Sequence, residues 1–473
     1  MSVDESSPRR VGATARAAAR VSAGALGVTV GLVDLTSPGL RYGYVHPLTR
    51  AVLRRPLASL PAVPGAAFHP LATGATVREP DLRCGLVADS LDIGGIGRVI
   101  EMLAEGLASE GIEPVVVCPQ EGQRTARLRE LGIEVVVAAD EQSAMQALVS
   151  ARLDVVQVHS APDHLVAAAV GTGAPLVPVL HNTEIHYSPE KWRSTAELFD
   201  RADSVIAVSA LVRQFHVERV PASAGEKIVV VANGAMPLPA ATDQVRSAAR
   251  AELERTLGTS LTGEVVFACL ARYDAQKNIA GTVASFLAAG RTSRAHLVVA
   301  GDPSDWLEYR RADAIRCSHP DGDRVHLLGT SDAATLLCAA DAFVLNSFFE
   351  GWPLAATEAV SAGLPLVISE AGGAAELVAR AAPGSTLVSN ASGAAAEVTD
   401  GRAAAARRRA SRQSNAAAIA AAVTHVAQTV RAQGRSGPPA DDSFATMVAG
   451  HAAVVRAAVA RRTDAIPHGR VGR

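Results

Sequence analysis

Short apolar runs recur along the chain from about residue 82, and longer stretches with helical periodicity lie between several of them. The runs occur at 84–87, 114–118, 134–137, 154–158, 175–180, 204–208, 227–231, 264–267, 296–300, 324–328, 342–345 and 365–368. Strands that are apolar throughout and alternate with helices are typical of a parallel sheet covered on both faces. A break at 236–263 separates the first seven runs from the last five. The pattern therefore predicts two consecutive α/β domains with doubly wound parallel sheets.

The two ends of the chain lack this rhythm. Residues 1–80 show no sustained periodicity, and we expect an N-terminal extension that is partly helical or disordered. Residues 386–473 are rich in Ala and Arg, and we expect them to be helical or partly disordered, with some helix returning to the first domain. The sheet domains are then expected at 81–240 and 241–385, with a ligand cleft between them, because such sheets bind at their strand carboxyl ends.

The formal net charge of −2 hides a split along the chain. Residues 1–60 hold eight Arg and three acidic residues, and residues 401–473 hold twelve Arg and three Asp. The remaining body, 61–400, carries a net charge of −16. An acidic body argues against nucleic acid as a partner. The Arg-bearing extension could make a peripheral contact with an anionic membrane, although a solvated tail or a helix packed on the body explains it better.

Cysteine usage and hydropathy point to the cytoplasm. The five cysteines are far apart and form no CxxC pair, so neither a disulfide framework nor a zinc site is supported. No uninterrupted run of eighteen apolar residues occurs, and we expect no transmembrane helix. The apolar stretch 21–33 is similar in length to a signal-peptide core, but no clear cleavage site follows it.

A Gly-rich turn follows the first predicted strand of the acidic body. Gly94, Gly95 and Gly97 would let backbone amides approach a phosphate at the start of the next helix. The turn lacks the GxGxxG spacing of dinucleotide-binding proteins. A purely structural turn is an equally good interpretation.

Polar side chains gather after two later strands of the same predicted domain. His181 follows the run at 175–180, and His159 and Asp163 follow the preceding run. In a parallel sheet these residues face one edge, and we take His159, Asp163 and Glu184 as candidates for contacts with an acceptor. His181 could exchange a hydrogen bond with a substrate hydroxyl, or it could be a hydrogen-bonded loop histidine. The histidines lack HExxH spacing, so we expect no metal site.

Two cations follow the first strand of the second domain. Arg272 and Lys277 are five residues apart on a loop that enters a helix, where they could clamp a diphosphate. Of the 45 basic residues, 42 are Arg, and Lys277 is one of only three Lys. A lysine retained in so Arg-rich a chain favours a role for this position over a solvated turn.

Two carboxylates and two glycines follow later strands. Glu350 is expected in the loop after the run at 342–345, and Glu358 in the helix that follows. A carboxylate there can accept hydrogen bonds from vicinal sugar hydroxyls, or it can simply complement the helix dipole. Gly372 and Gly373 form a second Gly turn suited to phosphate oxygens.

The set of these motifs resembles the retaining nucleotide-sugar glycosyltransferases of family 4. Arg272 with Lys277, and Glu350 and Glu358 separated by seven residues, carry the resemblance. The supporting motifs occur in the family's order: Gly94-Gly95, His181, 205–209, 231–234, Arg272 with Lys277, Glu350 to Glu358, and Gly372-Gly373 with Glu376. The resemblance covers about 82–380 and implies the GT-B fold, in which two Rossmann-like domains face a cleft and the second binds the donor.

The resemblance also implies roles for individual residues. Arg272 and Lys277 would hold the donor diphosphate, Glu358 the ribose hydroxyls, and Glu350 the transferred sugar. Gly372 and Gly373 would offer amides to the phosphates or the sugar. From the first domain, Gly95 would approach the β-phosphate, with Gly94 beside it, and His181 would contact the reacting sugar. The catalytic set is then His181, Arg272, Lys277 and Glu350, and neither a metal nor another cofactor is expected.

Two departures and several alternatives stay open. Asp302 stands where the family often has a small residue, and the leader is longer than usual. The donor is expected to be UDP- or GDP-linked, and the acidic body favours a cationic small acceptor such as an aminocyclitol of a secondary metabolic pathway. A lipid-linked acceptor at the membrane, a sugar-nucleotide epimerase of the same fold, and a non-catalytic sugar-nucleotide-binding protein are the alternatives.

Overall fold

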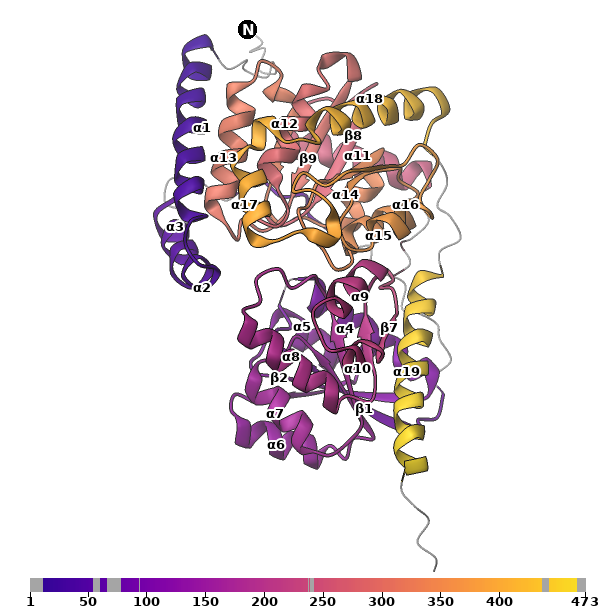
Figure 1. Ribbon diagram of the computed structural model, residues 1–473. Coiled ribbons are helices and arrows are strands. Elements are labelled where there is room, and N and C mark those ends of the chain that lie inside the picture. Colours follow the sequence, from indigo (N-terminus) through magenta and orange to yellow (C-terminus); the bar gives the residue numbers. More distant parts are fainter. Residues whose placement is uncertain are drawn as a thin grey trace, which may run out of the picture. The chain divides into compact units, whose positions relative to one another are not determined.

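The computed structural model describes residues 12–53, 60–65, 78–92, 94–236, 238, 242–435 and 442–465. The chain divides into two compact units (Figure 1). Unit 1 takes its described residues from Met1–Pro70 and Leu238–Ala440, and unit 2 from Leu71–Pro237 and Asp441–Arg473. Each unit is an α/β domain built on one parallel sheet.

The sheet of unit 2 has seven parallel strands in the order β3-β2-β1-β4-β5-β6-β7. Its strands are Val-rich and mostly buried, as expected for a sheet covered on both faces. They are β1 (Leu82–Ala88), β2 (Ile112–Cys118), β3 (Glu134–Val137), β4 (Val155–His159), β5 (Leu176–Leu180), β6 (Val205–Ala207) and β7 (Ile228–Val230). Each coincides with a run of the sequence pattern, so the prediction of this sheet is confirmed.

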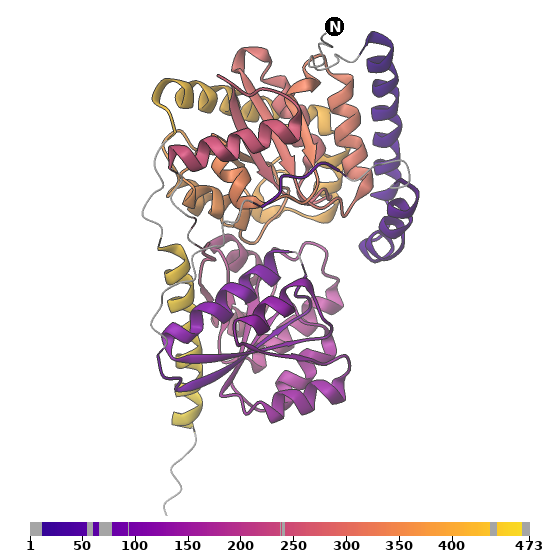
Figure 2. The same ribbon diagram turned by 180° about the vertical axis from the view of Figure 1, so that it is seen from behind.

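Helices between these strands cover both faces of the sheet. The crossover helices are α4 (Gly95–Gly106), α5 (Gln123–Glu130), α6 (Glu141–Ser150), α7 (Asp163–Gly171), α8 (Pro189–Arg201), α9 (Ala210–Val217) and α10 (Ala222–Gly225), with a 3-10 turn at Leu107–Glu110. Several begin at a side-chain cap, and in α6 the Asp140 carboxylate accepts the Ser143 N–H at 2.8 Å. A last helix, α19 (Ser443–Ala465), lies along the same unit (Figure 2).

The sheet of unit 1 has six parallel strands in the order β10-β9-β8-β11-β12-β13. This is the strand order of a Rossmann-like doubly wound sheet. The strands are β8 (Val265–Leu270), β9 (Ala295–Ala300), β10 (Val325–Leu328), β11 (Ala342–Leu345), β12 (Leu366–Ser369) and β13 (Thr386–Val388). The first five match predicted runs, whereas β13 is short and only partly buried, and the sequence pattern missed it.

The helices of unit 1 pack around this sheet (Figure 1). They are α11 (Asp243–Leu257), α12 (Ile279–Ala288), α13 (Trp306–Ser318), α14 (Ala333–Ala339), α15 (Leu354–Ser361), α16 (Ala374–Val378), α17 (Asp400–Arg408) and α18 (Ala416–Gln433). Short 3-10 turns lie at Arg291–Ser293, Gly322–Arg324, Ala395–Glu397 and Ala410–Arg412. Helix α18 packs against α12, which places part of the Ala/Arg-rich sequence in the body of the domain.

The N-terminal extension is helical where it is described, and it docks on unit 1. It consists of α1 (Ala13–Val33), α2 (Pro38–Leu40), a π-helical turn (Arg41–Val45) and α3 (His46–Leu53). Both α1 and α3 pack on α13 (Figure 1). Val30 and Val33 of α1 form a buried apolar cluster with Leu307 of α13.

A buried ion cluster fixes the extension to this place. Arg407 of α17 is paired with Asp34 at 3.0 Å, with Asp305 at 2.8 Å and with Glu308 at 3.2 Å, and none of the four side chains is more than 2% exposed. Arg41 adds an ion pair to Asp400 at 2.9 Å. The cluster joins three segments that lie far apart in the sequence.

The structure divides the ends of the chain differently from the expected ranges 1–80 and 386–473. The described part of the extension up to Gly65 belongs to unit 1, whereas residues from Arg78 belong to unit 2. The C-terminal region is also shared, because α17 and α18 complete unit 1 and α19 completes unit 2. Periodicity did not reveal this division because Ala-rich helices bury small side chains that leave a weak amphipathic pattern.

Two described helices are long and apolar enough to cross a membrane by length and composition alone, Ala13–Val33 and Ser443–Thr463. The sequence pattern did not single out either helix, because isolated polar residues interrupt both apolar runs. The second helix, within α19, also buries Met447, Val448 and Val455 as a core element of unit 2.

The ion cluster makes Arg407 a test of how the extension is held. Arg407→Met should leave three buried carboxylates without their cation and lower the free energy of unfolding of unit 1 by roughly 3–5 kcal/mol. The matched control is Arg408→Met, at an exposed position one residue along. Urea unfolding followed by circular dichroism checks this, and equal midpoints for the two variants would contradict the prediction.

Candidate functional site

The loop between β8 and α12 presents the two predicted donor cations. The Asp274 carboxylate organises it, because Oδ1 accepts the Lys277 N–H at 2.9 Å and Oδ2 pairs with Arg272 Nη2 at 3.0 Å. The hydroxyl of buried Tyr273 donates to the carbonyl oxygens of Val299 and Leu328, at 3.1 and 2.8 Å, and ties the loop to the ends of β9 and β10. Arg272 is half-exposed, so its remaining donors are open to a ligand.

Lys277 and Glu350 form an ion pair at the carboxyl ends of adjacent strands. Lys277 Nζ lies 2.6 Å from Glu350 Oε1, and the side chains are 18% and 6% exposed. Gln276 donates to the other carboxylate oxygen, Oε2, at 3.3 Å and to the Phe349 carbonyl at 2.9 Å. The structure thus brings together two predicted residues that are 73 positions apart in the sequence. It adds Gln276, which the sequence reasoning missed although it lies next to Lys277.

The Gly turn after β12 packs closely on the Glu350 loop. Gly372 has φ +52°, and a Cβ there would collide with the Gly351 carbonyl. A Cβ on Gly373 would collide with the Trp352 ring, and the Gly373 N–H donates to the Gly351 oxygen at 3.0 Å. Both glycines therefore have a packing reason, and the amide of Gly373 is engaged by a backbone carbonyl.

Glu358 lies on α15, one turn beyond the loop that carries Glu350, and is partly buried. The neighbouring Thr357 hydroxyl accepts the Trp352 indole N–H at 2.8 Å. This bond fixes the start of α15 against the Glu350 loop. Glu358 therefore stands on the helix that directly follows the Glu350 loop.

A network of buried amides lies behind the two donor-side loops. Asn278, in the left-handed conformation with φ 51°, donates to the Asn346 carbonyl at 3.0 Å and exchanges two hydrogen bonds with Gln413. Asn415 donates to Asn346 Oδ1 at 2.9 Å, and Asn390 donates to the Phe348 carbonyl at 2.8 Å. These residues hold the loops at fixed positions. No spacing along the chain indicates these residues, because their partners lie on distant segments.

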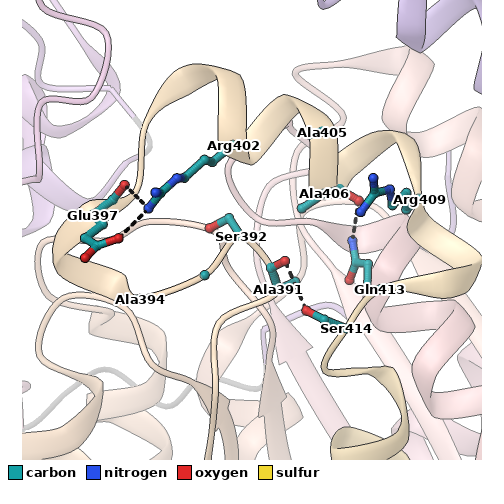
Figure 3. A pocket seen from close by; sticks show the side chains of 11 residues that line it. Ala391, Ser392, Ala394, Glu397, Arg402, Ala405, Ala406, Arg409, Gln413 and Ser414 are labelled. Atoms are coloured by element: carbon teal, nitrogen blue, oxygen red, sulfur yellow. Dashed lines mark hydrogen bonds and ion pairs between the residues drawn. The ribbon is translucent and has the colours of Figure 1, made fainter.

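Gln413 also lines a cavity of about 400 Å³ on unit 1 (Figure 3). Its walls come from 391–394 and from the segment around α17, and its polar groups include Arg402, paired with Glu397 at 2.7 Å. None of the predicted donor residues lines it. The cavity is therefore distinct from the Lys277–Glu350 loops.

In unit 2, His159 and His181 stand at the ends of adjacent strands and contact each other. His159 Nδ1 lies 2.9 Å from His181 Nε2, and His159 Nε2 lies 3.1 Å from Gln157 Oε1. His451 of α19 approaches the same oxygen with its Nδ1, also at 3.1 Å. Sequence reasoning missed Gln157 and His451, although a Gln within an apolar strand was a visible signal for a buried polar network.

Burial keeps these imidazoles neutral. It lowers the pKa of His181 to about 4 and that of His451 to about 3. The pKa of His159 lies well below its ordinary value because of burial and the two neighbouring histidines. Gln157 Oε1 accepts hydrogen bonds from His159 Nε2 and His451 Nδ1. Because a neutral imidazole has one N–H, His159 Nδ1 then accepts the hydrogen bond from His181 Nε2. His181 Nδ1 then carries a lone pair that can accept a hydrogen bond from a hydroxyl group.

The other acceptor-side candidates lie near β5 and α7. Asp163 pairs with Lys191 at 2.9 Å, but its side chain is 92% exposed, so the pair contributes little to stability. Burial raises the pKa of the partly buried Glu184 to about 7, and the charge of Lys191 opposes that rise. Glu184 thus titrates close to neutral pH.

Of the glycines at the start of α4, Gly97 is required by packing. A Cβ on Gly97 would lie 2.8 Å from the Asp92 carbonyl oxygen, whereas a Cβ on Gly94 would meet nothing within 4 Å. Arg98 of α4 and Arg124 of α5 both pair with the buried carboxylate of Glu101 in α4. Among the residues that the structure describes, no hydrogen bond or ion pair joins Gly94 or Gly95 to another predicted site residue.

Within the described residues, no group of three or more His, Cys, Asp or Glu side chains could hold a metal ion.

Two family models match the chain, one for the sequence of each sheet domain. The family model described as Glycosyltransferase Family 4 matches residues 93–236, and the model described as Glycosyl transferases group 1 matches residues 264–401. Glycogen synthase of Mycobacterium tuberculosis is 27% identical over 343 residues, which cover 60% of this chain and 77% of that protein.

Solved structures share the fold. A glycosyltransferase from Rickettsia africae has a TM-score of 0.58 at 15% identity and covers 80% of this chain and 98% of its own. The catalytic domain of starch synthase IV from Arabidopsis thaliana has a TM-score of 0.55 at 13% identity, with 80% and 100% covered. Anabaena HepE, solved with UDP-glucose, has a TM-score of 0.53 at 20% identity, with 74% and 98% covered.

The fold and these matches define a glycosyltransferase with two Rossmann-like domains of the GT-B type. The chain belongs to the family-4-like glycosyltransferases of this fold, the two family models together matching more than half of its length. The epimerase and the non-catalytic binding protein, both open from the residues alone, are therefore not the class that the matches support.

The raised pKa of Glu184 leads us to expect that the stability of the protein falls as the pH rises. Its folded-state pKa of about 7 is above that of an unfolded Glu, so the native state holds a proton that the unfolded state releases, and stability falls as pH rises from about 4.5 to 7. Glu184→Gln should therefore be more stable than the parent by roughly 1–3 kcal/mol above pH 7 and equal to it near pH 4. Thermal unfolding from pH 4 to 8 checks this, with the exposed Glu197→Gln as control. A difference that does not grow with pH would refute it.

Proposed function

We propose that the protein is a retaining glycosyltransferase that transfers a sugar from a UDP- or GDP-linked donor to a hydroxyl group of a small acceptor. The observation that carries the proposal is the placement of Arg272, Lys277 and Glu350 at strand carboxyl ends of a Rossmann-like sheet. Doubly wound sheets bind nucleotides at this edge. HepE, with the same fold, was solved with UDP-glucose, which supports a nucleotide-sugar donor.

The two cations would balance the charge of the donor diphosphate. Arg272 can bind phosphate oxygens in a bidentate manner, and Lys277 acts as a point charge. Lys277 is already held by Glu350, so it is oriented before a donor arrives and loses little side-chain entropy on binding. We propose that this pair of cations takes the place that a metal ion has in other diphosphate sites, and that no metal is needed.

The reaction would be a same-face displacement at the anomeric carbon. The acceptor oxygen forms the new glycosidic bond as the bond from the anomeric carbon to the β-phosphate oxygen breaks. The acceptor hydroxyl proton passes to that phosphate, and a nucleoside diphosphate leaves. Glu350 and Glu358 would bind sugar and ribose hydroxyls, and His181 would accept a hydrogen bond from a hydroxyl of the transferred sugar. Positioning and charge stabilisation would supply most of the rate.

The acceptor would be a small cationic molecule such as an aminocyclitol. Residues 81–236, the sequence of the first sheet domain, hold 21 acidic and 12 basic residues. A surplus of negative charge raises the local concentration of a cationic substrate. Asp163 and Glu184 each lie four residues after the end of one of the strands, β4 and β5, that lead to the histidines, and we propose them as contacts for its amino groups.

The donor site is tested through nucleotide affinity. Lys277→Ala and Glu358→Ala should each weaken binding of the cognate nucleoside diphosphate by roughly 1–3 kcal/mol, because each removes a charged hydrogen bond. Isothermal calorimetry measures this, with EDTA present so that any metal contribution is absent.

Lys191→Ala is the matched control, since it removes a lysine from an exposed ion pair of unit 2. Thermal unfolding of each variant separates lost binding from lost folding, because Lys277→Ala leaves Glu350 buried without its cation. Unchanged affinity in both donor-site variants would refute the proposed site.

The reaction is tested through its product. With an α-linked donor and an aminocyclitol acceptor, the protein should form an α-glycoside, and the anomeric coupling constant in the proton NMR spectrum reports this. A β-linked product would exclude retention. Failure of aminocyclitols with every donor that the enzyme hydrolyses would exclude this acceptor class while leaving the donor site intact.

A further inference from the structure

The N-terminal segment of unit 1 leaves large apolar side chains facing solvent. Eight of those exposed in the described residues lie between 21 and 52, with exposed fractions from 47% to 77%. They are Val21, Val28, Leu32, Leu35, Leu40, Tyr44, Leu48 and Val52. The other six are spread over 131–387 in both units. Such a concentration marks an interaction surface rather than ordinary surface composition.

Helix α1 has two apolar faces with different surroundings. Val30 and Val33 are buried against Leu307, and Leu26 packs on the same cluster. Val21, Val28 and Leu32 are spaced by seven and four residues, so they share the opposite face. That face is 63–74% exposed. One apolar side of the helix thus packs on α13, and the opposite apolar side is exposed in the described structure.

A second exposed stripe continues along the turn and α3. Tyr44, Leu48 and Val52 recur every four residues and are 62–73% exposed, whereas Leu53 of the same helix packs on the buried cluster. Both views show α1, α2 and α3 together on the flank of unit 1 beside α13 (Figures 1 and 2). The exposed stripes therefore belong to one side of one domain.

The charge of the segment is one-sided. Residues 12–55 hold six Arg and a single acidic residue, Asp34, and one of the six, Arg41, is buried in its pair with Asp400. Asp34 is buried against Arg407, so the described part of the segment presents no exposed carboxylate. Arg20, which immediately precedes Val21 on α1, is exposed. Apolar side chains bordered by cations and free of carboxylates match the interface of an anionic lipid bilayer.

We propose that α1, α2, the π-helical turn and α3 form a docking surface for an anionic phospholipid bilayer. The exposed apolar side chains enter the boundary between headgroups and acyl chains, and arginines contact the phosphates. The ion pair of Asp34 with Arg407 and the packing of Val30 and Val33 hold α1 on α13, so the helix lies on the membrane and does not cross it.

A second copy of the chain fits this surface less well. A two-fold interface brings the same patch against itself, so arginines would meet arginines with no carboxylate of the segment to pair them. A bilayer supplies the missing negative charge. The docking surface does not depend on the proposed donor or acceptor, because it lies on helices that carry none of the predicted site residues.

Vesicle binding of the full-length protein tests this proposal. The probes are vesicles of phosphatidylcholine alone and of phosphatidylcholine with roughly 30% phosphatidylglycerol. The parent protein should sediment with the anionic vesicles and not with the neutral ones, and added salt should release it.

Two variants remove the two parts of the surface. Val28→Ser/Leu32→Ser/Leu48→Ser removes apolar side chains, and Arg16→Gln/Arg20→Gln removes charge; each should weaken partitioning at least ~10-fold. The matched controls are Val149→Ser and Arg193→Gln, at exposed positions of unit 2. Substitution is used instead of deletion, because deletion would remove Asp34 from Arg407. Thermal unfolding shows whether each variant keeps its fold.

Three results would overturn the proposal. These are no binding to anionic vesicles, unchanged binding of folded variants, and a concentration-dependent dimer that the apolar substitutions dissociate in the absence of lipid. The last result would assign the surface to a second copy of the chain. Nucleotide affinity should be the same in all these variants, so failure here is distinct from failure of the donor site.

Discussion

All strands of each sheet run in the same direction, and this constraint determines where chemistry can take place. In a parallel sheet every strand-end loop of one direction lies at one edge. In unit 1, β8, β11 and β12 are neighbours, so the loops with Lys277, Glu350 and Gly372 meet. In unit 2, β4 and β5 are neighbours, so His159 and His181 meet. The side chains of both clusters then depend on short contacts between adjacent loops.

A second layer of polar residues keeps these loops in place. Amides of Asn278, Asn346 and Gln413 bond to one another behind the donor-side loop, and Gln157 Oε1 accepts from His159 and His451 behind the histidine pair. Buried polar groups are costly unless they are paired, so networks of this kind fix one conformation. The C-terminal segments supply Gln413 and Asn415 to the first network and His451 to the second. The Ala/Arg-rich end of the chain is therefore part of both candidate sites.

Much of this architecture could be predicted from the sequence. The apolar runs revealed every strand except β13, which has three residues and little burial, and spacing together with order along the chain pointed to Lys277 and Glu350. The supporting residues could not be found in this way. Gln157 and His451 are 294 positions apart. Arg407 stands in a run of arginines that is typical of a solvent-exposed segment, although its side chain is buried. Local pattern carries no information on such long-range pairs.

The charge split along the sequence has a structural explanation as well. The basic ends dock on acidic residues, since Arg407 pairs with Asp34, Asp305 and Glu308, Arg456 with Asp81, and Arg462 with Asp203. Part of the positive charge is thus neutralised inside each unit.

The central claim concerns the binding of a nucleotide by unit 1. A thermal-shift measurement of the parent protein with UDP, GDP, ADP and their sugar conjugates tests it most directly, because a ligand that binds the native state raises its apparent stability. We expect UDP or GDP and the corresponding nucleotide sugar to raise the unfolding temperature. No shift with any of these compounds, at millimolar concentration, would contradict it.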